Sequence, residues 1–136
     1  FGSQCVVVGI DSVREDGEWV TRQMTGKPDS MQSTGYRTLD WIGEVTRRGA
    51  GEIVLNCMGS DGTREGFDIE QLKAARRRTD VPLIASGGAG SARHFIDVFR
   101  EADVDGALAA TVFHNRTVPI PALKQALAAE SVRVRL

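Results

Sequence analysis

A single pattern repeats along the chain: a short apolar, β-branched segment, then a loop, then residues with helical spacing. Continuous apolar segments of this kind are typical of strands that are buried on both faces of a parallel sheet. Repeats of about 30 residues match the length of the βαβ motif. The strand segments are residues 5–10, 52–56, 81–85 and 104–109, and the helical patterns are 38–48, 68–78, 91–102 and a last one that begins at Pro119 or Pro121.

This order predicts an α/β fold of four strand–helix units, (βα)4, in which right-handed crossovers bring all strand carboxyl ends to one edge. A closed (β/α)8 barrel needs about 250 residues, and the chain has 136. We therefore expect one half-barrel domain over residues 1–136, half of a TIM barrel whose first half is absent. The opening Phe1-Gly2-Ser3-Gln4, directly ahead of a strand and without Met, indicates a cut at an element boundary.

A polar stretch separates the first strand from the first helical pattern. The first strand is expected to stop at Asp11. Asp16-Gly17 is a hairpin turn signal and predicts a small antiparallel excursion over residues 14–24. Residues 26–35 are rich in Gly, Pro, Ser and Thr and are predicted to form a loop.

Composition narrows the possible partners. The net charge of −1 lacks the electrostatic footprint of a nucleic-acid or membrane-surface binder. No apolar run reaches the roughly 18 residues of a membrane span. Cys5 and Cys57 show neither a disulfide framework nor CxxC spacing, which favours a reducing cytoplasm.

Polar residues and glycines follow each predicted strand, at the edge where parallel sheets bind ligands. Ser86-Gly87-Gly88-Ala89-Gly90 is a glycine-rich turn into a helix, where backbone N–H groups can approach an anion. We expect a phosphate site there, with tight turns alone as the alternative. The converging residues are Asp11, Asn56, Asp61, Gly62, Thr63, Ser86, Gly87, Gly88, Ala109, Ala110 and Thr111.

Asp11 and Asp61 are the candidate acid/base groups at this edge, and a turn or cap role is the alternative for each. Neither has a His or Cys at ligand spacing, so no metal and no other cofactor is assigned. Surface or packing roles are expected for His94 and His114. Because no lysine follows a predicted strand, the pattern argues against Schiff-base chemistry.

Longer motifs carry a resemblance over nearly the whole chain. The chain resembles the cyclase subunit of imidazole glycerol phosphate synthase, in its C-terminal half only. The motifs that carry this resemblance are residues 1–4 with 6–8 and 10–11, Asp61-Gly62-Thr63 with Gly66, the run 85–90 with His94-Phe95, and the run 107–114. The Phe-Gly-Ser-Gln opening and Val112-Phe113-His114 favour this family over a sister isomerase of histidine biosynthesis.

The resemblance implies a (β/α)8 enzyme that uses ammonia from a glutaminase partner. It would cleave and cyclise phosphoribulosyl-formimino aminoimidazole carboxamide ribotide into imidazole glycerol phosphate and an aminoimidazole carboxamide ribotide. Asp11 matches one of two catalytic aspartates, Asp61 a further carboxylate near the substrate, and Glu52 a residue that gates ammonia entry. Gly88, Ala110 and Thr111 match one of two phosphate sites. From their place at the strand ends, we also expect Gly62 and Gly87 to bind phosphate and Asn56 and Ser86 to contact substrate.

The chain departs from the family at a few positions. Thr111 stands where Ser is commoner and keeps the hydroxyl, and Gly59-Ser60 precede Asp61 where the family often has polar or acidic residues. The other catalytic aspartate and the other phosphate site belong to the half that we expect to be absent. We therefore expect little or no turnover from the chain alone.

Two further functions stay open. One is a half-barrel that binds a phosphorylated small molecule, or free phosphate or sulfate, without chemistry. The other is an assembly unit whose open edges pair with another copy to form a homodimer or a higher even oligomer. Pairing with the missing first half of the barrel is an equally sensible alternative.

Overall fold

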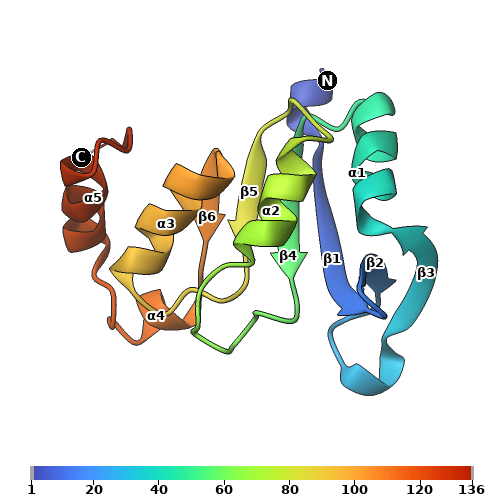
Figure 1. The fold of residues 1–136 in the computed structure, drawn as a ribbon, viewed down its shortest axis with the longest axis horizontal. Helices are drawn as coiled ribbons and strands as arrows, with labels where there is room; N and C mark the ends of the chain where they lie inside the picture. The colour runs from blue at the N-terminus through green and yellow to red at the C-terminus, as the bar shows by residue number, and fades with distance from the viewer. Residues whose placement is uncertain (1, 136) are drawn as a thin grey trace.

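Six strands form one mixed sheet in the order β3-β2-β1-β4-β5-β6 (Figure 1). The computed structural model describes residues 2–135. Its strands are β1 (Val7–Glu15), β2 (Glu18–Gln23), β3 (Gln32–Arg37), β4 (Glu52–Cys57), β5 (Leu83–Ser86) and β6 (Gly106–Leu108). Its helices are α1 (Thr38–Arg47), α2 (Ile69–Arg76), α3 (Ala92–Ala102), α4 (Thr111–His114) and α5 (Ile120–Ala129), with 3-10 turns η1 (Ser3–Cys5) and η2 (Pro28–Ser30).

The parallel part of the sheet consists of β1, β4, β5 and β6, each paired with the next. Helices α1, α2 and α3 lie along one side of it, and α5 packs beside α3 at the end away from the hairpin (Figure 1). Alternate strand residues are buried under these helices, among them Ile10, Ile53, Leu55, Leu83 and Ala85. This α/β architecture is that of half a TIM barrel, as the sequence predicts.

The opposite face of the parallel sheet carries its side chains in register. Val7 pairs with Glu52 in the row nearest the strand starts. The next row is Gly9, Val54, Ile84 and Gly106, and the row nearest the strand ends is Asp11, Asn56, Ser86 and Leu108. In a closed barrel such rows form the layers of the interior. Here Val7 and Leu108 are exposed.

The first strand is longer than predicted. It continues through Asp11 to Glu15, because residues 11–15 pair with β2 in an antiparallel hairpin. The hairpin turn itself is confirmed at Asp16 and Gly17, which both have positive φ. The parallel pairing with β4 nevertheless ends at Ser12, so Asp11 lies where the core of the sheet ends.

One strand, one short helix and both 3-10 turns were not predicted. The segment predicted as a loop over 26–35 contains η2 and the start of β3. Strand β3 has no apolar alternation, and its antiparallel pairing with β2 at the edge of the sheet holds it instead. Helix α4 follows β6 directly and has only four residues, too few for a periodic pattern.

The remaining predicted elements are confirmed with shifts at their ends. Asp68 caps α2, accepting a hydrogen bond from the Gln71 backbone N–H at 2.9 Å. Strand β6 is shorter than predicted, at Gly106–Leu108. Between residues 2 and 135, every helix falls short of the length and apolarity that a membrane crossing requires.

Candidate functional site

The end row of the sheet brings together three of the predicted site residues. Asp11 pairs in register with Asn56, and Asn56 pairs with Ser86. The Asn56 Nδ2 donates a hydrogen bond of 2.9 Å to the Asp11 Oδ1. Because strand register sets this contact, the carboxylate has a fixed place on the open face.

The other Asp11 oxygen has a partner that the sequence did not reveal. The Thr25 hydroxyl donates a hydrogen bond to the Asp11 Oδ2. Thr25 follows β2, and the hairpin carries it back toward the strand from which Asp11 projects. No spacing rule links residues 11 and 25, so only the predicted hairpin could have suggested the contact.

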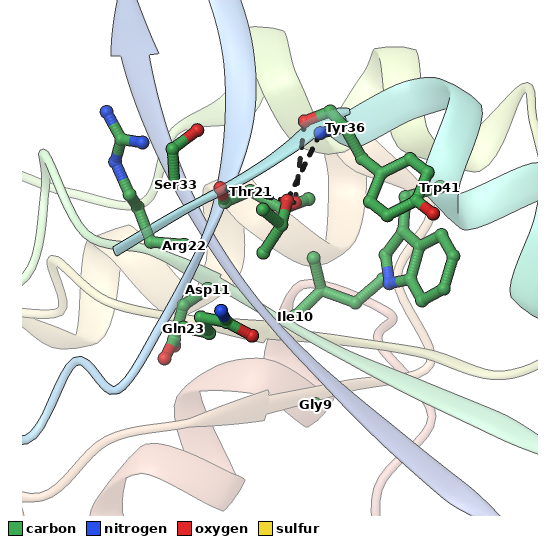
Figure 2. Close-up of a pocket in the computed structure, with 10 residues that line it drawn as sticks. Gly9, Ile10, Asp11, Thr21, Arg22, Gln23, Ser33, Tyr36 and Trp41 are labelled. Atoms are coloured by element: carbon green, nitrogen blue, oxygen red, sulfur yellow. Dashed lines mark hydrogen bonds between the residues drawn. The ribbon is translucent and has the colours of Figure 1, made fainter. Parts of the chain in front are cut away.

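Asp11 lies at one end of a pocket of about 420 Å³ along β1 and β2. Figure 2 shows the Tyr36 ring over Trp41 at the other end of this pocket, with Asp11 beside Gln23. The two rings stack with their centroids 4.6 Å apart. The pocket runs along Gly9 and Ile10, where β2 no longer pairs with β1.

A second pocket, of about 260 Å³, contains all five residues that were predicted to bind phosphate. Its walls come from the loops after β4, β5 and β6. The lining residues are Asn56, Asp61, Gly62, Arg64, Ser86, Gly87, Gly88, Ala89, Leu108, Ala109, Ala110 and Thr111. We name this pocket the glycine pocket.

Glycine is required in the wall of the glycine pocket. Gly88 has φ +103°, and a Cβ there would lie 2.0 Å from the carbonyl oxygen of Gly66. The Gly66 N–H donates a hydrogen bond of 2.9 Å to the Gly88 carbonyl oxygen, which joins the loops after β4 and β5. The close approach of two backbones leaves no room for any other residue at position 88.

Arg64 is a second residue that the sequence analysis missed. It is exposed and lines the glycine pocket with a left-handed backbone, φ +60°. A positive φ at a residue other than glycine is uncommon, and the sequence contains no sign of it. The signal becomes visible only when the loop is placed against Gly88 and Gly90.

The remaining predicted residues differ in their distance from these pockets, and neither Glu52 nor His94 lines one. Glu52 lies on the same open face of the sheet as Asp11. Its row is four residues before the Asp11 row along the strands, so the two rows are about 13 Å apart. Asp61 lines the glycine pocket, whereas Asp11 lines the neighbouring pocket, and Asn56 is the residue between them. The His94 Nδ1 accepts a hydrogen bond of 3.1 Å from the Gly90 N–H, which supports a packing role.

Cys57 ends strand β4 directly after Asn56 and points into the core. Burial beneath the sheet raises the pKa of the Cys57 thiol, and the nearby Asp68 carboxylate raises this pKa further. Cys57 is thus a neutral side chain of the core, 2% exposed. In residues 2–135, no group of three or more His, Cys, Asp or Glu side chains is arranged to hold a metal ion.

Comparison with known proteins identifies relatives of the whole chain. Residues 1–119 match the family model described as histidine biosynthesis protein. The imidazole glycerol phosphate synthase subunit HisF of Xanthomonas oryzae pv. oryzae is 62% identical over 136 residues, which cover 99% of this chain and 53% of that protein. The HisF subunits of Xanthomonas axonopodis pv. citri and Stenotrophomonas maltophilia are 61% and 60% identical, with the same coverage.

The chain spans about half the length of these curated relatives. The resemblance found in the sequence motifs is therefore confirmed over the full chain. The chain belongs to the histidine biosynthesis protein family, as a relative of the HisF subunits.

Proposed function

We propose that the chain supplies one half of a cyclase active site of the imidazole glycerol phosphate synthase type. The complete site would use ammonia to convert phosphoribulosyl-formimino aminoimidazole carboxamide ribotide into imidazole glycerol phosphate and an aminoimidazole carboxamide ribotide. The observation that carries this proposal is the register row Asp11, Asn56 and Ser86 beside the glycine pocket. Kinship with the HisF subunits supports it.

The residues divide between binding and proton transfer. Backbone N–H groups around Gly62, Gly87 and Gly88, with Ala110 and Thr111, would hold one phosphate of the substrate. A substrate fixed at one end presents its reacting carbons along the end row of the sheet. Asp11 would transfer protons there as a general acid/base, with Asp61 as a second carboxylate near the phosphate.

The opposite end of the open face would admit ammonia. Glu52 lies in the first row of that face, at the start of its strand, about 13 Å from Asp11. We propose that Glu52 gates ammonia that a glutaminase subunit delivers at that end. We also propose that the assembly works in the cytoplasm. The free thiols of Cys5 and Cys57 support this location, because a reducing compartment keeps thiols free.

The chain alone should turn over little or no substrate. One general acid/base group contributes about 10²–10⁴-fold to a rate, and in this proposal the second catalytic aspartate and the second phosphate site come from outside these residues. A substrate held at one end only also loses the advantage of fixed positioning.

The test is ammonia-dependent consumption of the bisphosphate substrate by the chain at high concentration, without any partner, and again with the remaining half of a HisF subunit supplied. Activity should appear with the added half and disappear in Asp11→Asn. Asp16→Asn is the matched control, because Asp16 lies in the hairpin turn, where Asn tolerates the positive φ. If Asp11→Asn stays as active as the control, Asp11 is not the acid/base group.

A second candidate function is a phosphate-binding half-barrel that self-assembles without catalysis. The exposed apolar side chains of Val7 and Leu108 on the open face favour assembly, since another copy would cover them. Binding of inorganic phosphate with no turnover, even when the other half is supplied, would favour this function over the cyclase.

A further inference from the structure

The charge balance of the glycine pocket depends on two side chains. Among its lining residues only Asp61 and Arg64 carry a formal charge. A carboxylate beside a phosphate repels it, and backbone N–H groups alone would have to offset that repulsion. Arg64 is the cation on this wall that can do so.

The position of Arg64 is determined by backbone packing. A Cβ at Gly90 would lie 2.2 Å from the carbonyl oxygen of Arg64 and 2.8 Å from the Arg64 Cβ. With the hydrogen bond between Gly66 and Gly88, this contact holds the loop after β4 against the turn after β5. The backbone of Arg64 is thus held at the rim of the pocket by its close contact with Gly90.

Two features indicate that the side chain has a use there. The backbone of Arg64 is left-handed, a conformation that glycine adopts with far less strain than arginine. In the described part of the chain, no carboxylate lies within ion-pair distance of Arg64, whereas Arg93 in α3 pairs with Asp97 at 2.8 Å. A guanidinium has five donors in one plane and binds phosphate oxygens in pairs.

We propose that Arg64 is a phosphate-binding side chain that makes the glycine pocket selective for the dianionic phosphate end of a small-molecule substrate. The proposal rests on the assignment of a phosphate to this pocket under the proposed function. It adds a cationic side chain to a phosphate site that the proposed function builds from backbone N–H groups and the Thr111 hydroxyl.

The test is an NMR titration of the chain with inorganic phosphate, following the backbone amides of Gly62, Gly87 and Gly88 at constant ionic strength. Arg64→Gln should weaken phosphate binding by at least about ten-fold, the scale of one charge-assisted hydrogen bond. Arg116→Gln is the matched control. Arg116 is also an exposed arginine with positive φ, +55°, and it does not line the pocket.

A second variant separates binding from folding. Arg64→Gly should raise the Tm, since glycine removes the strain of the positive φ, and should still weaken phosphate binding. Loss of affinity in a more stable protein cannot come from unfolding. Arg64→Lys keeps the charge but not the paired donors, so it should bind phosphate with intermediate affinity.

The outcomes distinguish this inference from the proposed function. If the wild-type chain binds phosphate and Arg64→Gln binds it equally well, Arg64 has no such role and the glycine pocket remains a phosphate site. If Arg64→Gln and Arg116→Gln lose affinity equally, the effect is one of overall charge and the inference is wrong. If the wild-type chain does not bind phosphate at the glycine amides, both the inference and the phosphate assignment fail.

Discussion

Asp11 is held through both of its carboxylate oxygens. The Asn56 amide donates to Oδ1, and the Thr25 hydroxyl donates to Oδ2. The two donors come from opposite neighbours of β1, one from β4 and one from the segment after β2. A carboxylate fixed in this way does not need to be reoriented when substrate binds, which is the condition for efficient proton transfer.

Thr25 should therefore affect catalysis through Asp11 as a positioning residue. In a cyclase completed with the remaining half of a HisF subunit, Thr25→Val should lower kcat by about ten-fold, the scale of one lost hydrogen bond to a charged group, and change KM little. Thr25→Ser keeps the hydroxyl and should retain most of kcat. Steady-state kinetics of the three proteins test this, and equal kcat values for Val and Ser variants would contradict it.

The two thiols should differ sharply in reactivity. Cys5 is exposed and Cys57 is buried with a raised pKa. At pH 8 a thiol reagent should modify Cys5 rapidly and Cys57 only after denaturant is added, because the thiolate is the reacting form. Rapid labelling of both cysteines in the folded chain would show that the region beneath Asn56 opens readily.

The same thiol makes stability depend on alkaline pH. Folding holds the proton on Cys57, whereas the unfolded thiol ionises near its ordinary pKa of about 8.5. The protonated Cys57 therefore makes its full contribution to the free energy of unfolding below that pH, and this contribution is lost as the pH rises above it. Denaturant titrations at pH 7.5 and 9.5 should show this loss in the wild type and a smaller one in Cys57→Ala.

Among the elements, β1, α1 and α2 meet at a buried cluster of polar side chains. The hydroxyls of Ser12 and Thr38 lie 2.7 Å apart, and the Gln71 Nε2 donates to the Ser12 hydroxyl. Each of the three residues is at most 1% exposed. Buried polar groups are costly unless they are paired, so this cluster favours one arrangement of the two helices against the strand next to Asp11.

Truncation of Gln71 should be strongly destabilising. Gln71→Ala leaves a cavity and removes a donor from the buried Ser12 hydroxyl, which should cost about 2–4 kcal/mol of unfolding free energy. Gln125→Ala is the matched control, an exposed glutamine inside α5. Chemical denaturation measures both, and a loss for Gln71→Ala no larger than that of the control would contradict the role of the cluster.

The sequence predicts those helices and strands that have one apolar face, which is buried in the core. The helices over 38–47 and 92–102 and the strand over 52–57 carry their apolar residues at helical or strand spacing, so the pattern predicts them. Strand β3 depends on pairing with β2, and α4 is too short to show a period. Strand β3 and helix α4 therefore form because of contacts with other parts of the chain, and the local sequence pattern does not predict such contacts.

The same distinction applies to the site. The row Asp11, Asn56 and Ser86 follows from the rule that parallel strands end at one edge, and the glycine pocket follows from the glycine-rich turn beside it. Thr25 and Arg64 reach the site through loop packing, namely the return of the hairpin and the approach of residues 64–66 to the turn at 88–90. The spacing of residues in the sequence predicts neither contact.

At the scale of the whole molecule, the parallel sheet has one covered and one open face. Its two edges are also open in part, because β2 leaves residues 7–10 of β1 unpaired and β6 pairs only with β5. Four parallel strands from each of two copies would make the eight strands of a closed barrel. The edge of β1 in each copy would pair with β6 of the other, so a dimer would leave neither edge exposed.

We therefore propose that the chain is a homodimer or a higher even oligomer in solution, and that the open face lies in the contact. Leu108 and Ile120 are matched probes, since they are 49% and 50% exposed and only Leu108 is on the open face. Sedimentation velocity should find assembled wild-type chain, assembled Ile120→Lys and monomeric Leu108→Lys, because a lysine in the closed interior would be buried without a partner. A folded wild-type monomer at micromolar concentration would exclude the assembly, and equal behaviour of the two lysine variants would place the contact elsewhere on the molecule.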